Sequence, residues 1–375
     1  MSADDLVQRV RLLRSPGIGP VTFRQLLLRF GSPARAIEAV PDLTARGGGR
    51  RPALFREDQA LREIEQVRAL GGRYLVAGQG LYPRLLAEAE DAPPLLTALG
   101  DVTLLDKPLV AMVGARNASA AACRFARSLA HELGREGQVV VSGLARGIDA
   151  AAHEGALETG TIGVIAGGLD VFYPPENERL QRSLASQGLV LAEMPPGTEP
   201  RARHFPYRNR IIAGVSSGTV VVEAAPRSGS LITARLAAEM GREVMAVPGS
   251  PLDPRAQGCN GLIRDGATLV QNAGEVLEAL RPGLGRVQSG RDLFSYSPEV
   301  PASAGMTGGA AMTGGAEPDS SERARVEELL GPAPAPVDEI VRLSGLEPGA
   351  VQLVLLELDL AGRLDRHAGG KVSLR

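Results

Sequence analysis

Six short apolar runs alternate with stretches of helical periodicity between residues 109 and 280. Runs that are apolar at every position are typical of parallel strands buried on both faces of a sheet. Helical patterns of roughly 10 to 16 residues separate them, so the connections are expected to be right-handed βαβ crossovers. The alternation predicts an α/β core, a doubly wound Rossmann-like and mostly parallel sheet, over residues 80–282. The runs are 109–113, 138–141, 161–165, 189–191, 219–222 and 243–247.

The segment before the core, residues 1–75, is predicted to be a small all-α domain because its apolar residues recur at helical spacing. Within it, Ser15-Pro16-Gly17-Ile18-Gly19-Pro20 forces a tight turn. This turn resembles the hairpin of helix-hairpin-helix modules, which contact DNA phosphates through backbone amides. An ordinary turn between packed helices is the favoured interpretation, because no cluster of Lys or Arg flanks it.

A tract over residues 283–320 has no periodicity and contains Met-Thr-Gly-Gly-Ala twice, at 306–310 and 312–316. Such composition predicts a flexible linker. Beyond it, three helical patterns at 321–330, 337–346 and 348–360 precede two short strands around Gly369-Gly370, which predicts a winged helix over residues 321–375.

The third of these helices is poorly suited to reading DNA sequence. It carries Glu357 and Asp359, and no basic residue stands between Arg342 and Arg363. Reading bases in the major groove needs hydrogen-bond donors at these positions. Its apolar positions favour a packing or protein-contact role: Val351, Val354, Leu355 and Leu358.

Composition excludes several classes of protein. The 41 basic and 43 acidic residues nearly cancel, so any attraction for phosphate must come from a local patch. Cys123 and Cys259 fit neither a disulfide framework nor a metal site, and both are expected to be small core residues in a reducing compartment. No apolar run reaches the roughly 20 residues that span a bilayer, and no signal pattern opens the chain. We expect a cytoplasmic protein without a membrane or metal partner.

Four turns rich in Gly, Ser and Arg are each expected just after a short apolar run, at residues 114–117, 142–147, 207–210 and 227–230. A parallel sheet gathers the loops at the carboxyl ends of its strands into one crevice, so these turns can converge on one anionic ligand. Four turns of the same chemistry suggest a ligand with repeated phosphates. The candidate DNA-binding residues in them are Gly114, Arg116, Ser142, Gly143, Arg146, Gly147, Arg208, Asn209, Arg210, Ser228, Gly229 and Ser230.

Aromatic residues add a second element to this candidate surface. Residues 201–210 hold four arginines and two aromatics without one acid, and Tyr173 lies in another loop that should follow a strand. Alternating basic and aromatic side chains are typical of a channel for single-stranded nucleic acid. There, arginine neutralises phosphate and an exposed aromatic ring stacks on a nucleobase. Arg203, Phe205 and Tyr173 therefore join the candidate site. The alternative is that Phe205 packs under its loop while the arginines pair with acids elsewhere.

Other chemistries are less well supported by the residues. No Gly-x-Gly-x-x-Gly follows the first run, which argues against NAD, and no cofactor is expected. Ser119 is expected to cap the next helix, with the positive helix end facing the same anion as Arg116. Asp149 and His153 could be an acid–base pair, but without a nucleophile or metal beside them, helix capping and a buried hydrogen bond are favoured. No catalytic residue is assigned.

Taken together, the motifs resemble the DNA-processing protein A family (DprA, also called Smf). The similarity covers about residues 80–280, and the flanks fit a sterile-alpha-motif-like helical domain and a winged helix. The family usually has Ser where this chain has Ala115, which removes one possible phosphate contact and keeps the charge of Arg116. The segments that carry the resemblance are 142–153, 167–174, 205–214, 222–224, 228–235, 241–244, 247–249 and 258–260.

The resemblance implies a cytoplasmic homodimer that is not an enzyme. It implies binding and protection of incoming single-stranded DNA, and loading of the RecA recombinase during natural transformation in competent cells. A different class, the nucleotide phosphoribohydrolases, stays open because Gly167-Gly168, Ser217-Gly218-Thr219 and Glu223 faintly echo their Pro-Gly-Gly-x-Gly-Thr-x-x-Glu signature. The parts of the signature are far apart in this sequence, which disfavours the hypothesis of a phosphoribohydrolase. A sequence-specific regulator is disfavoured by the acidic third helix of the winged helix.

Overall fold

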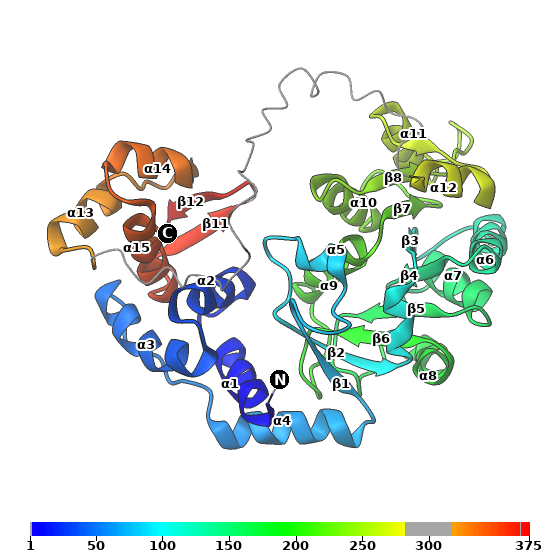
Figure 1. Cartoon of the computed structure of the whole chain (residues 1–375). Helices are drawn as coiled ribbons and strands as arrows, with labels where there is room; N and C mark the ends of the chain where they lie inside the picture. The colour runs from blue at the N-terminus through cyan, green and yellow to red at the C-terminus, as the bar shows by residue number, and fades with distance from the viewer. Residues whose placement is uncertain (1, 282–316, 368) are drawn as a thin grey trace, which may run out of the picture. The chain divides into compact units, whose positions relative to one another are not determined.

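The computed structural model describes residues 2–281, 317–367 and 369–375, which form two compact units (Figure 1). One unit joins the residues up to 64 with the described residues from 317 onward. The other begins at residue 65, inside a helix, and contains the α/β core. The linker predicted over 283–320 lies mostly outside the described residues.

The core is built on a sheet of nine strands within the described residues, in the order β1-β2-β6-β5-β4-β3-β7-β8-β9. All six predicted strands are present, and β3 to β9 pair in parallel wherever they are neighbours. Two strands that the sequence analysis did not predict, β1 and β2, extend one edge in antiparallel fashion. The strands are β1 (Arg73–Val76), β2 (Leu95–Gly100), β3 (Leu109–Val113), β4 (Val139–Ser142), β5 (Thr161–Ile165), β6 (Leu189–Ala192), β7 (Gly218–Val221), β8 (Glu243–Ala246) and β9 (Thr268–Leu269).

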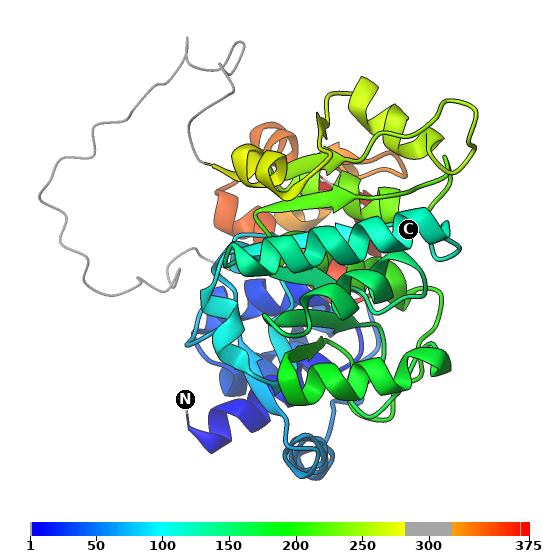
Figure 2. The same ribbon diagram turned by 90° about the vertical axis from the view of Figure 1, so that its right-hand side faces the viewer.

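Helices cover both faces of this sheet (Figure 2). Side chains alternate between the faces along a strand, so Leu109 and Ala111 of β3 join one apolar cluster while Val110 and Met112 join the other. Burial on both sides explains why the runs are apolar throughout. One face carries α5 (Arg84–Ala87), α9 (His204–Val215), α10 (Ser230–Glu239) and α11 (Gln257–Arg264); the other carries α6 (Ala120–Arg135), α7 (Ile148–Ala156), α8 (Glu178–Gln187) and α12 (Ala273–Leu280).

The order of the strands creates a switch point beside β3. The chain proceeds outward from β3 through β4 and β5 to β6, then returns to place β7 on the other side of β3. In open α/β sheets, ligands bind outside the carboxyl ends of the strands at such a point. The loops that follow β3, β4, β5 and β6 all reach this edge.

The unit that joins the residues up to 64 with those from 317 onward contains the predicted N-terminal helices. They are α1 (Ala3–Arg14), α2 (Pro20–Phe30), α3 (Pro33–Arg46) and the first part of α4 (Glu57–Ala69). Between α1 and α2, Gly17 adopts a φ of 78° and the buried Ile18 donates its amide to the Ser15 carbonyl at 3.3 Å. The glycine-rich segment is therefore the tight hairpin that the sequence predicts.

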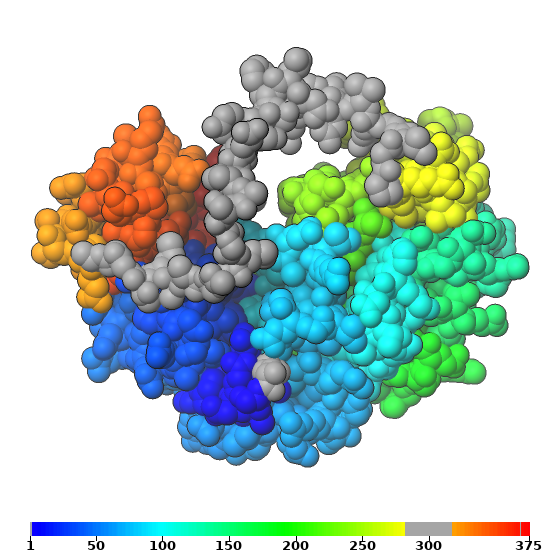
Figure 3. All heavy atoms as spheres, in the orientation of Figure 1, coloured from blue at the N-terminus to red at the C-terminus, as the bar shows by residue number. Residues whose placement is uncertain are grey.

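The winged helix also folds as predicted, with three helices and a β-hairpin. Its elements are α13 (Ser320–Glu328), β10 (Ala335–Pro336), α14 (Val337–Ser344), α15 (Pro348–Leu360), β11 (Leu364–His367) and β12 (Lys371–Leu374). The four apolar positions singled out on α15 pack in the module's own core. In the space-filling view, blue N-terminal residues adjoin the orange residues of this module (Figure 3).

Both cysteines pack in the α/β core, as expected. Cys259 is buried and donates its thiol to the Val221 carbonyl at 3.5 Å, and burial raises the pKa of this thiol to about 11. Cys123 is half-buried against the cluster that holds α6. In the part of the chain that the structure describes, no helix has the length and apolar character needed to cross a membrane.

Candidate nucleic-acid interface

A small pocket of about 40 Å³ lies at the carboxyl ends of β3 to β6. The loops after β3, β4 and β5 contribute to its lining, together with the first turns of α9. Six of the residues predicted from the sequence meet here: Arg116, Gly143, Arg146, Tyr173, Phe205 and Arg208. The convergence of separate turns on one crevice is therefore present in the fold.

The ring of Phe205 is the centre of this pocket. Phe205 is half-buried, and the guanidinium carbons of Arg116 and Arg208 lie 5.0 Å and 5.9 Å from its centroid. The ring of Tyr173, which is 45% exposed, lies 5.8 Å away at 54°. Two cations and two rings thus occupy one small surface. Such a group can pair with phosphate and stack on a base.

Arg208 is held in an unusual environment for a cation. It is only 7% exposed, and its Nη1 lies 3.8 Å from Asp149 Oδ2. A Cβ at Gly143 would stand 1.5 Å from this Nη1, so the guanidinium can occupy its place only because residue 143 is glycine. Among the described residues, Nε of Arg208 has no hydrogen-bond partner. Burial lowers the pKa of Arg208, and nearby Arg116 lowers it further.

Asp149 is the anion that balances part of this charge. Its Oδ2 accepts hydrogen bonds from the amides of Gly143 and Ala145 at 3.2 Å and 3.3 Å. Burial raises the pKa of Asp149, while Arg208 and the two amides oppose that shift. These two amides of the loop after β4 therefore already donate hydrogen bonds within the protein. Two arginines face one carboxylate, which leaves net positive charge at the pocket.

His153 takes no part in an acid–base pair with Asp149. Its Nδ1 lies 2.8 Å from Thr161 Oγ1, and complete burial lowers the pKa of His153 to about 3. The imidazole is therefore neutral near pH 7. The buried hydrogen bond predicted for His153 is confirmed. The predicted helix capping by Asp149 is wrong, because α7 begins after Gly147 without a side-chain cap and the Asp149 carboxylate accepts amides of the preceding loop instead.

Glycines in the loops after β3 and β4 allow these two loops to pack on each other. A Cβ at Gly114 would lie 2.5 Å from Ile148 Cγ1, and one at Gly147 would lie 2.3 Å from the Ala115 carbonyl. This close packing fixes the backbone beside Arg116, whose side chain is exposed. Arg146 is also exposed and lies 3.9 Å from Glu176 in a solvated ion pair.

Several predicted residues have their polar groups engaged elsewhere. The hydroxyl of fully buried Ser142 donates to the Met112 carbonyl at 2.6 Å. Buried Arg210 pairs with Glu193 at 2.6 Å and with Asp91 at 3.4 Å. For Arg210, the alternative stated from the sequence, pairing with acids, describes what the structure contains.

The remaining predicted residues do not line the pocket. Asn209 Nδ2 donates to the Gly229 carbonyl at 3.5 Å, which links α9 to the turn after β7. In that turn, Ser228 Oγ and Ser230 Oγ lie 2.7 Å apart. Arg203 is exposed at the start of α9.

The structure corrects the prediction that the start of α6 is open to the ligand. Ser119 does cap α6, because its Oγ accepts the amide of Ala122 at 3.0 Å. Glu223, which follows β7, fills that end: its carboxylate accepts the Ser119 amide at 2.9 Å and the Ser119 hydroxyl at 2.8 Å. The positive end of α6 is thus neutralised within the protein.

Sequence reasoning placed Tyr173, in the loop after β5, at the site but missed other lining residues from the loops after β5 and β6. Gly167, Val171 and Pro200 line the pocket. The two loops are joined where the Gly168 amide donates to the Thr198 carbonyl at 3.0 Å. A Cβ at Gly167 would lie 2.7 Å from that same carbonyl. The glycine pair was visible in the sequence, but its partner loop was not.

Comparison with protein families covers almost the whole chain. Residues 73–281 match the model of DNA recombination-mediator protein A. Residues 3–65 match a DprA-like N-terminal HHH domain, and residues 310–370 match a DprA winged helix domain.

Similar proteins and structures agree with this match. The DNA processing protein DprA of Streptococcus pneumoniae is 50% identical over 198 residues, covering 52% of this chain and 70% of that protein. The Smf protein of a Synechocystis strain is 32% identical over 382 residues and covers 96% of both chains.

Among solved structures, DprA from Streptococcus pneumoniae has a TM-score of 0.64 at 38% identity, covering 72% of this chain and 96% of that one. A structure of DNA processing protein A from Helicobacter pylori, described for its single-stranded DNA binding mode, has a TM-score of 0.51 at 31% identity, covering 56% of this chain and 95% of that one. The chain belongs to the DNA recombination-mediator protein A family, whose members are named DprA or Smf.

Proposed function

We propose that this chain binds single-stranded DNA at the pocket around Phe205. Arg116 and Arg208 would pair with backbone phosphates, and the Phe205 ring would stack on a base, with Tyr173 beside it. The observation that carries the proposal is that two guanidinium groups lie within 6 Å of the Phe205 ring centroid, one of them nearly buried and paired with a single carboxylate at 3.8 Å.

Neighbouring residues extend the proposed path of the strand. Arg146 and Arg203 are exposed and would neutralise flanking phosphates. The Ser228–Ser230 turn stays a proposed contact on the far side of β3. A single strand fits better than a duplex, because bases that stack on side chains have to be unpaired.

We also propose the roles that the family resemblance implies. The chain would act in the cytoplasm as a homodimer, protect incoming single-stranded DNA and load the RecA recombinase during natural transformation. Support comes from membership of the family and from the single-stranded DNA binding mode described for the Helicobacter pylori protein.

A binding role is favoured over cleavage of nucleoside monophosphates. The carboxylate that would act in such a reaction, Glu223, has both oxygens in hydrogen bonds with Ser119. Asp149 and His153 are likewise engaged with loop amides and Thr161. We therefore propose that the pocket holds its ligand without catalysing a reaction on it.

Titration of a labelled, unstructured oligonucleotide at several salt concentrations tests this function. Affinity should fall by about 0.7 log units per tenfold increase in salt for each phosphate engaged. Arg116→Ala should weaken binding and flatten this slope. Phe205→Ala should cost about 1 to 3 kcal/mol of binding energy and leave the slope nearly unchanged, because stacking releases no counterions.

Arg182→Ala is the matched control for these variants. The Arg182 guanidinium lies 4.3 Å from the centroid of Phe172, so the variant also loses a cation from a ring, but away from the pocket lining. It should bind like the parent. A salt slope near zero, or turnover of a nucleoside monophosphate, would refute the proposed function.

A further inference from the structure

Helix α15 is buried along most of its length, although it occupies the place of the DNA-reading helix in a winged helix. One of its faces, with Val351, Val354, Leu355 and Leu358, packs in the module's own core. A DNA-reading helix keeps its other face exposed and polar so that side chains reach the bases. Here that face is apolar. Leu353, Leu356 and Leu360 are each at most 7% exposed.

The helices at the beginning of the chain cover this second face. The three leucines form a single apolar cluster with residues of α1, α2 and α3, including Leu12, Phe23, Leu26 and Val40. Leu12, Leu26 and Val40 are completely buried in it. The N-terminal helices thus obtain part of their core from the far end of the sequence.

Two glycines after α3 let the backbones approach closely. A Cβ at Gly47 would lie 2.1 Å from the Glu357 carbonyl oxygen and 3.0 Å from Ala361 Cβ. A Cβ at Gly49 would lie 2.8 Å from Ala361 Cα. Gly47 has a φ of −71°, which any residue can adopt, so the close contact with α15 is what requires a glycine there.

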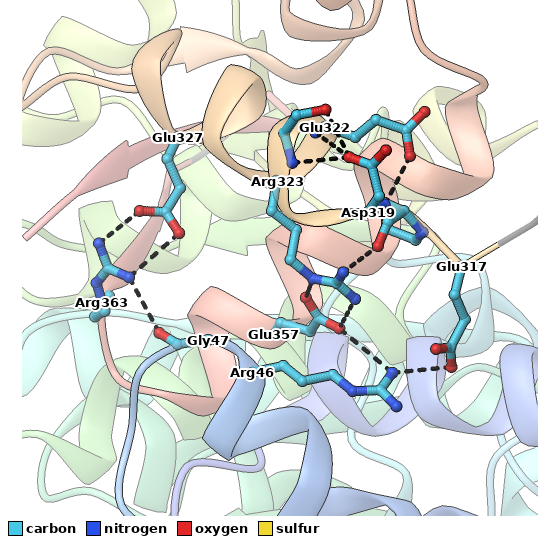
Figure 4. Close-up of polar contacts among 11 residues, drawn as sticks. Arg46, Gly47, Glu317, Asp319, Glu322, Arg323, Glu327, Glu357 and Arg363 are labelled. Carbon is cyan, nitrogen blue, oxygen red and sulfur yellow. Dashed lines mark hydrogen bonds and ion pairs between the residues drawn. The ribbon is translucent and has the colours of Figure 1, made fainter.

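The acidic groups of α15 have partners in this arrangement. Glu357 is 1% exposed and accepts hydrogen bonds from Arg323 Nε at 2.8 Å and Nη2 at 3.0 Å (Figure 4). Arg46 of α3 lies 4.0 Å from the same carboxylate. Arg363 Nη1 donates to the Gly47 carbonyl at 3.1 Å. Glu357 is thus paired mainly with Arg323 of α13 in its own module, while Arg46 and Gly47 add contacts from the N-terminal segment.

A second polar contact lies two residues further along α15. Asp359 Oδ2 accepts the Thr22 hydroxyl of α2 at 2.8 Å and Arg366 Nε at 2.9 Å. Arg366 also donates to Gln25 Oε1 at 2.9 Å. The interface thus combines an apolar centre with a hydrogen-bonded rim, which is the anatomy of a specific protein interface.

We propose that α15 is a protein-binding helix whose partner is the N-terminal helical segment of this same chain. Residues 2–64 and 317–375 then form one composite domain whose two parts lie on either side of the whole α/β core in the sequence. In this composite domain α15 is unavailable to DNA. The partner is identified by the apolar face, the two glycines and the paired acids described above.

Cutting the linker in the full chain tests the proposal. A protease site is inserted between residues 308 and 309, and the cleaved protein is analysed by gel filtration at micromolar concentration. The C-terminal fragment should co-elute with the rest of the chain. Gly47→Ala should release it, because the three atoms nearest to the added methyl group all belong to α15 and the residue after it, the first of them at 2.1 Å.

Gly349→Ala is the matched control, since its added Cβ meets nothing within 4 Å and lies on α15 itself. This variant should retain the fragment. Leu356→Glu is a second disruptive variant, which places a charge in the apolar centre of the interface. Hydrogen exchange of the released fragment from Gly47→Ala should show its own core still protected, so release is distinguished from unfolding.

Release of the fragment from the cleaved parent would overturn the proposal. Retention in both Gly47→Ala and Leu356→Glu would overturn it as well, since the fragment would then be held by another surface.

Discussion

At the scale of single residues, Arg208 is both a ligand group and part of the fold. A buried guanidinium is costly unless it is paired, and Arg208 has one carboxylate at 3.8 Å and an unpartnered Nε within the described residues. Its charge is thus only partly satisfied by the protein. An incoming phosphate would supply what is missing, which is why we place Arg208 at the centre of the proposed site.

Arg208→Met tests this double role. The substitution keeps the volume and removes the charge, so Asp149 is left buried without its counterion. Breaking a buried pair in this way costs about 3 to 5 kcal/mol, and we expect a clear drop in melting temperature together with weaker DNA binding.

The double variant Arg208→Met with Asp149→Asn separates the two effects. It should recover much of the lost stability but none of the DNA affinity. Arg235→Met is the control: Arg235 is 71% exposed and pairs with Glu239 at 3.4 Å, and such a surface pair is worth about 0 to 1 kcal/mol. Equal destabilisation by Arg208→Met and Arg235→Met would contradict the assignment.

At the scale of elements, the pocket depends on how closely the loops after β3 and β4 pack. Gly147 has a φ of 74°, and its Cα faces the Ala115 carbonyl so closely that a Cβ would lie 2.3 Å from that oxygen. The Ile148 amide donates to the same carbonyl at 3.2 Å. The conformation of one loop therefore sets the position of Arg116 in the other.

Gly147→Ala should move the two loops apart and weaken DNA binding. With a φ of 74° and a ψ of −121°, Gly147 lies outside the left-handed helical region, in a conformation that favours glycine. Forcing alanine into such a sparsely populated conformation costs about 1 to 3 kcal/mol, and overpacking adds typically 1 to 3 kcal/mol. Gly137→Ala is the matched control, because Gly137 has a φ of 81° but a Cβ there meets nothing within 4 Å. Both variants should lose stability in urea unfolding, while only Gly147→Ala should lose affinity. Normal binding by Gly147→Ala would show that the loop contact does not position Arg116.

The elements that could be predicted from the sequence are those with strong local patterns. The strands β3 to β8 are apolar on both faces, and α15 begins at Pro348, so their types and approximate bounds were visible. By contrast, β1 and β2 are antiparallel edge strands outside the βαβ alternation, and β9 has only two residues. Their strand character depends on pairing partners that are distant in the sequence.

The same distinction applies to the site. Phe205, Arg116 and Arg208 stand in turns whose chemistry is visible locally, and the sheet brings them together as predicted. The partners of Ser142, Arg210 and the start of α6 could not be identified from the sequence, because each partner belongs to another element; for Arg210 only pairing with an unspecified acid was foreseen. Glu223, which fills the end of α6, gives no local signal of that role.

At the scale of the whole molecule, the chain forms two units that do not follow the sequence order. The sequence indicates an N-terminal helical domain and a separate winged helix, whereas in the structure both belong to one compact unit. The reason lies in α15, whose second apolar face completes the core of α1 to α3. Periodicity reveals that a helix is apolar all round, but not which distant segment covers it.

The whole-molecule arrangement leads to a prediction about truncated chains. A chain that ends at Leu280 keeps the α/β core but deprives α1 to α3 of Leu353, Leu356 and Leu360. A chain of residues 70–281 lacks the N-terminal helices as well and keeps the core clusters around β3 intact. We expect the chain that ends at Leu280 to expose an apolar surface, bind a hydrophobic dye and self-associate. The chain of residues 70–281 should be monodisperse in its native state. Both should bind single-stranded DNA within tenfold of the full chain, because every residue lining the pocket belongs to the core unit. Anisotropy titrations of the three chains at one salt concentration measure this. A loss of more than tenfold in the shorter chain, about 1.4 kcal/mol, would mean that residues outside the core are a main DNA-binding element and that the pocket around Phe205 is insufficient.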